Sequence, residues 1–213
     1  DVAIDRALSR RLTATLAYEA AYFDIDFEPS VWTHTPRVGL SYRLTETITL
    51  AASGGPSFEV FEGGDRDDRV TPAVAASYDQ RTFFGAVRLD FDRRIGVAGG
   101  IGGPTDNTSI RGRIDVTTLM RGLTLSLGPR YSIVKSHDDR PRPIDIQAFT
   151  MPLTATYRLT AWIAAVASYQ FFRQRTDGVV ISRTGEVFAE DADQNRVFVG
   201  LQFGYPFTLD RPW

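Results

Sequence analysis

The chain contains no cysteine among its 213 residues, which excludes disulfide frameworks, thiolate metal sites and cysteine nucleophiles. It also lacks a long apolar run. The longest candidate, residues 161–167, is far shorter than the roughly 18 residues that a membrane helix needs. A formal net charge of −2 gives no indication of nucleic-acid binding. These absences leave two possibilities: a soluble protein of one or two domains, and a membrane barrel, in which only every second residue faces lipid.

What the sequence does contain is a period-two alternation of apolar and polar residues. In the first long run, Leu12, Leu16 and Tyr18 share one face, and Thr13 and Glu19 share the other. A period of two indicates a strand rather than a helix. About ten such runs approach the length that a tilted membrane strand requires. They lie near residues 12–22, 38–43, 48–53, 70–78, 83–91, 109–117, 123–133, 149–157, 162–172 and 196–205.

Short turns and long charged connections alternate between these runs. Three of the short turns read almost alike: Ser-Arg-Arg-Leu-Thr at 9–13, Ser-Tyr-Arg-Leu-Thr at 41–45 and Thr-Tyr-Arg-Leu-Thr at 156–160. This alternation predicts an all-β fold, a transmembrane antiparallel up-and-down β-barrel forming a single domain over residues 1–213. We expect about ten strands, with twelve as the alternative. The short turns are then periplasmic, and the expected extracellular loops cover about 24–36, 62–69, 93–108, 135–145 and 173–195.

Aromatic residues recur at both ends of the expected strands, as the two interfacial belts of a membrane barrel require. Packing in the core of a soluble β-sandwich is the alternative for these rings. Tyr42, Tyr78, Tyr157 and Tyr205 lie toward the short turns, and Tyr22, Phe58, Phe91, Tyr131, Phe149, Tyr169 and Phe171 lie toward the long loops.

The Tyr-Arg-Leu-Thr turns and the run Asn-Arg-Val-Phe-Val-Gly-Leu-Gln-Phe-Gly-Tyr at 195–205 resemble bacterial outer-membrane β-barrel proteins. They are similar in particular to barrels found beside exopolysaccharide-export and exosortase systems. In such proteins the final strand is an assembly signal, and Gly200, Phe203 and Tyr205 have its spacing. An aromatic residue usually ends the chain there, whereas residues 206–213 follow here. The resemblance implies location in the outer membrane of a Gram-negative bacterium.

The alternation also assigns charged side chains to the inward face, where they must pair or meet water. One interpretation is a salt-bridged lumen that braces a narrow barrel; Arg113 and Asp115 would then pair with neighbouring strands. The other is a polar, porin-like pore, in which six arginines against three acids favour anions. The predicted lumen-lining residues are Glu19, Arg43, Arg88, Asp90, Arg111, Arg113, Asp115, Arg130, Arg196 and Gln202.

Candidates for catalysis and metal binding are weak. His34 and His137 are the only histidines, both in expected loops, and the run His137-Asp138-Asp139 has the residue types of a carboxylate-oriented general base. The acids at 65, 67 and 68 lack the spaced glycine and distal glutamate of a calcium loop. The glycine-rich segment 99–103 leads into no phosphate-binding strand-turn-helix. We therefore expect no catalytic, metal or cofactor site.

The predicted function is a non-enzymatic wall, pore or anchoring component of an envelope export or surface-assembly system. The alternatives are a cell-surface hydrolase using loop residues near His137, and a structural partner that binds an extracellular polymer or filament through the long loops. Expected partners are outer-membrane lipid and lipopolysaccharide, and other envelope or surface-assembly proteins, without nucleic acid. We expect residues 1–9 to be a periplasmic lead-in, and the run 12–22 to close the barrel against 197–205. The alternative is that residues 2–5 end a strand and that the chain is a fragment of a longer barrel.

Overall fold

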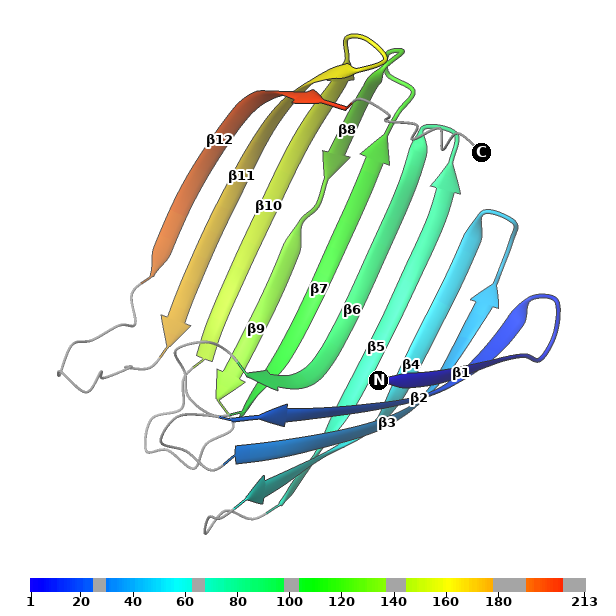
Figure 1. Cartoon of the computed structure of the whole chain (residues 1–213), viewed down its shortest axis with the longest axis vertical. Coiled ribbons are helices and arrows are strands. Elements are labelled where there is room, and N and C mark those ends of the chain that lie inside the picture. Colours follow the sequence, from blue (N-terminus) through cyan, green and yellow to red (C-terminus); the bar gives the residue numbers. More distant parts are fainter. Residues whose placement is uncertain (25–29, 63–67, 98–103, 137–144, 178–190, 205–213) are drawn as a thin grey trace, which may run out of the picture.

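The structure, a computed structural model, describes residues 1–24, 30–62, 68–97, 104–136, 145–177 and 191–204. They form one antiparallel sheet in which strands neighbouring in sequence are neighbours in space (Figure 1). The all-β, up-and-down prediction is therefore confirmed. The twelve strands are β1 (Val2–Ala7), β2 (Leu12–Phe23), β3 (Ser30–Arg43), β4 (Ile48–Glu62), β5 (Arg69–Thr82), β6 (Gly85–Val97), β7 (Pro104–Val116), β8 (Leu123–Leu127), β9 (Arg130–Ser136), β10 (Asp145–Arg158), β11 (Ile163–Asp177) and β12 (Ala192–Phe203).

Two of these strands, β8 and β9, share a single position in the sheet. Both pair with β7 on one side and β10 on the other, in one continuous register. Between them, the N–H of Gly112 donates to the carbonyl of Pro129 at 2.8 Å, and the N–H of Gly128 donates to the carbonyl of Pro152 at 3.0 Å. The expected single run at 123–133 thus exists, with a local break where proline supplies no N–H.

The edges of the sheet differ from the sequence-based expectation. Residues 2–7 form a strand that pairs with β2, so their assignment as a lead-in was wrong. Their alternation covers only six residues, which made the strand hard to recognise. Because β2 has β1 on one side and β3 on the other, the expected pairing of 12–22 with 197–205 is not formed. Within the described residues, β12 pairs only with β11. Up-and-down order over eleven positions makes β1 and β12 run in the same direction.

Several strands extend into segments that we expected to be loops. β3 begins at Ser30, so His34 lies in a strand rather than in a loop. Likewise, β6 continues to Val97, β7 begins at Pro104 and β11 continues to Asp177. The polar residues of these segments are paired with neighbouring strands in the sheet. Composition alone does not reveal that pairing. The predicted short turns near Arg10, Leu44 and Leu159 are confirmed, and two further short connections lie at 83–84 and 117–122.

The sheet has one apolar and one polar face. It curls around the polar face (Figure 1), and residues at alternate positions of β2 to β7 surround a hollow on that side. We call this side the concave face and the other the convex face. Among the described residues, Val31 and Ala73 are the only buried hydrophobic ones. Large apolar side chains of the convex face are instead exposed, including Leu16 at 57% and Leu201 at 58%.

Prolines and one glycine interrupt the ladder between β3 and β4. The register pairs His34 with Phe58 and Val38 with Gly54, and the three positions between them are unpaired. Pro36 and Pro56 face each other there, and neither can donate a backbone hydrogen bond. On the concave face, the buried hydroxyls of Thr35 and Ser57 bridge the gap at 2.7 Å.

Gly55 allows the two strands to approach at this interruption. A Cβ at Gly55 would lie 1.9 Å from the carbonyl oxygen of Pro36, whereas one at Gly54 would come no closer than 3.6 Å to the carbonyl oxygen of Ala73. We therefore expect Gly55→Ala to lower the free energy of unfolding by about 1–3 kcal/mol, as overpacking does. Gly54→Ala is the matched control and should change it by much less. Urea unfolding in lipid vesicles measures both, and equal losses would contradict this account.

A polar concave face and its arginine pair

All ten predicted lumen-lining residues lie on the concave face. The pairing register places all of them on the same face of the sheet, from Glu19 on β2 to Arg196 and Gln202 on β12. The leucines and valine at positions 16, 87, 125, 153 and 201 occupy the opposite face by the same register. The alternation in the sequence therefore assigned both faces, although the lumen itself remains a prediction because the described edges do not pair.

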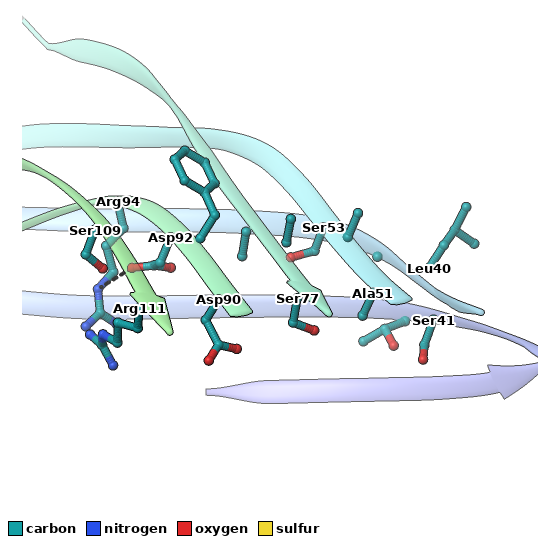
Figure 2. Close-up of a pocket in the computed structure, with 16 residues that line it drawn as sticks. Leu40, Ser41, Ala51, Ser53, Ser77, Asp90, Asp92, Arg94, Ser109 and Arg111 are labelled. Carbon is teal, nitrogen blue, oxygen red and sulfur yellow. Dashed lines mark ion pairs between the residues drawn. The ribbon is translucent and has the colours of Figure 1, made fainter. Parts of the chain in front are cut away.

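Small residues make the concave face hollow over β3, β4 and β5. Gly39, Ser53 and Ala75 stand directly opposite one another, and neighbouring positions carry serine and alanine. Figure 2 shows the charged side chains of Asp90, Asp92, Arg94 and Arg111 at one side of this hollow, on β6 and β7. The cavity has a volume of about 530 Å³. Its hydroxyls and charges suit a polar solute or water.

A second hollow lies closer to the short turns. It has a volume of about 680 Å³ and is bordered by charged residues of β3, β5, β6 and β7. They include Arg43, Asp79, Arg88, Arg113 and Asp115. Together the two hollows form a polar surface along several strands of the sheet.

Three of the six arginines that line these hollows pair with a carboxylate, namely Arg88, Arg94 and Arg113. Arg88 pairs with Asp79, which stands directly opposite on β5. Arg113 pairs with Asp115 at 2.8 Å along its own strand. In the braced-lumen interpretation, both residues would find an opposite charge on a neighbouring strand. Their ion pair instead joins two positions of β7, while Asp115 also interacts electrostatically with Arg88 of β6. Residues i and i+2 of a strand share a face, so the nearest carboxylate to Arg113 lies within β7, while Asp115 also accepts from Ser126 of β8.

Two arginines are different. Arg111 on β7 and Arg130 on β9 stand directly opposite each other, on the same face. Within the described part of the chain, neither makes an ion pair or a side-chain hydrogen bond. The sequence placed both on the inward face, but it could not bring them together, because β7 and β9 are joined through the 117–122 turn and the β8 break.

The convex face has a regular order of residue types along each strand. The described aromatic residues of both predicted belts lie on this face. Between the belts, the convex positions of β2 to β12 carry no charged residue in the described ranges. On β11, this uncharged stretch covers the nine residues from Ile163 to Phe171.

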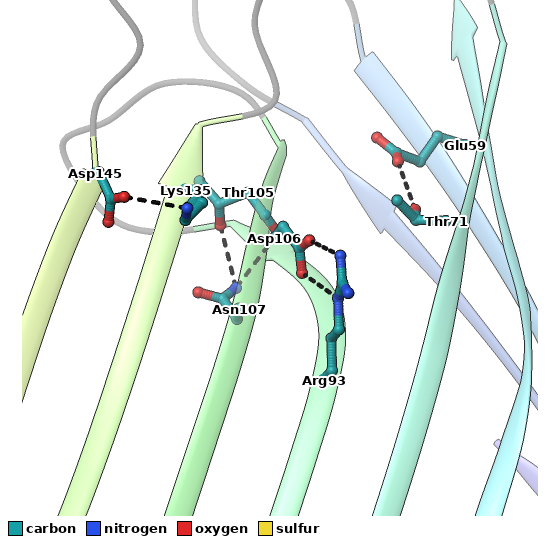
Figure 3. A network of polar contacts seen from close by, with 8 residues as sticks. All are labelled: Glu59, Thr71, Arg93, Thr105, Asp106, Asn107, Lys135 and Asp145. Atoms are coloured by element: carbon teal, nitrogen blue, oxygen red, sulfur yellow. Dashed lines mark hydrogen bonds and ion pairs between the residues drawn. The ribbon is translucent and has the colours of Figure 1, made fainter.

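On β1, Arg6 lies on the convex face near a short turn. On the other described strands, convex charges appear only beyond the belt at the long-loop end. There they form cross-strand ion pairs, which we call the rim pairs. Figure 3 shows Arg93 with Asp106 at 2.6 Å and Lys135 with Asp145 at 3.3 Å. The remaining rim pairs are Arg173 with Asp193 at 3.7 Å and Arg175 with Asp191. Sequence reasoning assigned most of these residues to loops; the signal that it missed was alternation continuing past the aromatic residues.

The catalytic and metal candidates lie largely outside the described residues. His137 and the two acids after it, and the acids at 65 and 67, lie outside the described residues. His34 lies on the convex face, 2.7 Å from the hydroxyl of Tyr18 and stacked against Trp32. Over the described ranges, no cluster of three histidines or acids could hold a metal ion. No helix in those ranges is long and apolar enough to cross a membrane.

Comparison with known proteins adds a family. A family described as "Putative MetA-pathway of phenol degradation" matches residues 101–211, which is more than half of the chain. The chain belongs to this family. The match covers β7 to β12 and therefore includes Arg111 and Arg130. It also includes every rim pair except one: of Arg93 and Asp106, it contains only Asp106. No curated protein sequence is detectably similar.

Solved structures with a similar fold include two outer-membrane proteins with low sequence identity. One is a copper transporter, OprC, at 11% identity and a TM-score of 0.45, with 89% of this chain and 36% of that chain covered. The other is the ferric yersiniabactin uptake receptor FyuA from Yersinia pestis, at 14% identity and a TM-score of 0.41. That match covers 93% of this chain and 40% of that chain. This family member thus spans less than half the length of either structure.

The exposure of the Arg113–Asp115 pair determines its contribution to stability. The arginine side chain is 64% exposed and the aspartate side chain 24% exposed, unlike the buried lumen pair expected from the sequence. We predict that Arg113→Gln lowers the free energy of unfolding by less than about 1 kcal/mol, rather than the 3–5 kcal/mol of a buried pair. Urea unfolding with Arg196→Gln as the control measures the difference. A loss of 3 kcal/mol or more would contradict the prediction.

Acid should weaken the Arg175–Asp191 rim pair. The Arg175 side chain and the N–H of Thr176 both donate to Asp191 and hold the pKa of its carboxyl below the usual range. Such a group stabilises the fold above its unfolded-state pKa and loses that effect as the pH falls through its folded pKa. Arg175→Gln should raise the pKa of Asp191 toward its ordinary value, and Arg173→Gln should raise it less. Carboxyl chemical shifts in an NMR pH titration measure the change; an unchanged pKa in Arg175→Gln would count against the pair.

Proposed function

We propose that this protein spans the bacterial outer membrane as the wall of a β-barrel and that its concave face lines a polar path for solutes. The observation that supports this most directly is the convex face. Its exposed leucines and valines form an uncharged band between two rows of aromatic side chains, and the rim pairs begin only beyond that band. Water is an unfavourable solvent for such a surface, and a bilayer is a favourable one.

The dimensions of the band fit this proposal. A tilted membrane strand needs about 9–11 residues, and the uncharged stretch of β11 has nine. Aromatic rings favour the boundary between lipid and water. The rim pairs would then lie outside the hydrocarbon region, where charges meet water and polar lipid headgroups.

The concave face supports a path or binding surface rather than a packed core. Its hollows are lined by hydroxyls and charges, and small residues leave space between them. The role is non-enzymatic in this proposal, because the described part of the chain offers no constellation of nucleophile, base and oxyanion donors. A link to export or surface assembly depends only on the resemblance of the short turns and the final strand.

The family description favours a second candidate within the same class. A barrel wall in a phenol-degradation pathway would serve by letting an aromatic compound cross the outer membrane. Uptake of phenol into vesicles containing the folded protein, compared with uptake of glucose, distinguishes this narrower role from a general polar path.

The facing of β8 provides the test of the membrane assignment. Leu125 lies on the convex face and Thr124 on the concave face. We expect Leu125→Arg to lower the free energy of unfolding in lipid vesicles by roughly 2–4 kcal/mol, because the new charge would enter hydrocarbon. Thr124→Arg adds the same side chain to the polar face and should cost much less. Equal costs, or folding of the wild type without lipid or detergent, would overturn the proposal.

A further inference from the structure

The unpartnered arginines of the concave face set one place on it apart. Across the sheet, one row of residues on this face runs from Asp90 through Arg111 and Arg130 to Thr150, each directly opposite the next. In the described ranges no carboxylate pairs with either arginine, although Asp90 stands opposite Arg111. By contrast, Arg88, Arg94 and Arg113 each have an aspartate partner.

Like charges directly opposite in a sheet are destabilising. The guanidinium groups of Arg111 and Arg130 repel each other, and Arg94, on the same face, adds to the positive charge acting on Arg130. Both arginines are exposed, and no described carboxylate forms an ion pair with either of them. An anion between them would replace the repulsion with two attractions.

The geometry suits such an anion. Residues facing each other across antiparallel strands have Cβ atoms only about 4.5–5.5 Å apart, so two long side chains can converge on one group. Each guanidinium offers a planar fork of donors that matches the oxygens of a carboxylate or a phosphate. The adjacent row of the concave face contributes the hydroxyls of Ser109 and Ser132, which stand opposite each other and can donate further hydrogen bonds.

We propose that Arg111 and Arg130 form a binding site for a small anion that bears a carboxylate or phosphate group. The site lies at the edge of the hollow over β3, β4 and β5, whose lining includes Arg111, Asp90 and Ser109 (Figure 2). It deepens the proposed function, on which it rests, by naming the class of solute that the concave face holds: anions rather than cations.

Calorimetric titration of the folded wild type in detergent micelles at low ionic strength tests the site. Inorganic phosphate and acetate are the two probes, titrated separately. Binding of either probe supports the site. The probe that binds more tightly identifies the group, phosphate or carboxylate, that the site prefers. A folded wild type that binds neither probe overturns the proposal.

Substitutions locate the binding. Arg111→Gln and Arg130→Gln should each weaken it by about tenfold or more, the loss of one charge-assisted contact. Arg196→Gln is the matched control: it removes an arginine from the same face, but one that stands opposite Gln170 rather than another arginine. Asp90→Asn should strengthen binding, because it removes the negative charge beside Arg111. Equal affinity in all four variants and the wild type would refute the assignment.

A conductance measurement separates this site from the proposed function. If the wild type binds phosphate or acetate but conducts no ions in a planar bilayer, the anion site stands and the solute path fails. If the wild type conducts ions but Arg111→Gln and Arg130→Gln bind phosphate and acetate as well as the wild type does, the solute path stands and the anion site fails.

Discussion

The backbone hydrogen-bond ladder holds this molecule together, because its side chains build almost no core. Only Val31 and Ala73 are buried hydrophobic residues in the described structure, whereas the ladder pairs nearly every position of β2 to β11 on both sides. A sheet of this kind must satisfy each face from its surroundings. The apolar convex face therefore needs an apolar solvent, and the polar concave face needs water or a ligand.

The register of the ladder decides which residue meets which solvent. Because side chains alternate, a slip of one residue in any strand would move its leucines to the concave face and its arginines into lipid. The register nevertheless continues through two interruptions. Pro36 and Pro56 open the ladder between β3 and β4, and the Thr35–Ser57 hydrogen bond spans the gap. At Gly128 and Pro129, β8 and β9 keep the same register on both sides.

Charge is distributed differently on the two faces. On the convex face of β2 to β12 it appears only where the uncharged band ends, mostly in the rim pairs that join neighbouring strands. On the concave face it lies at several levels, from Arg43 near a short turn to Arg94 near the long-loop end. Arg88, Arg94 and Arg113 each pair with an aspartate. Within the described residues Arg111 and Arg130 do not, and they stand directly opposite each other, which is the basis of the proposed anion site.

The sequence by itself determined the fold class, the short turns and the two faces, since all three depend on local alternation and turn residues. It also placed each lumen-lining residue, such as Arg111 and Arg130, on the correct face. It did not determine where strands end or which strands lie at the edges. His34, Arg93 and Lys135 are in strands because residues on the neighbouring strands bind their polar groups. Residues 2–7 form a strand because β2 lies beside them. Tertiary structure alone decided which charges meet. Arg113 pairs with Asp115 on its own strand, and Arg111 lies opposite Arg130. The pairing between strands depends on their register, and no single run of residues specifies that register.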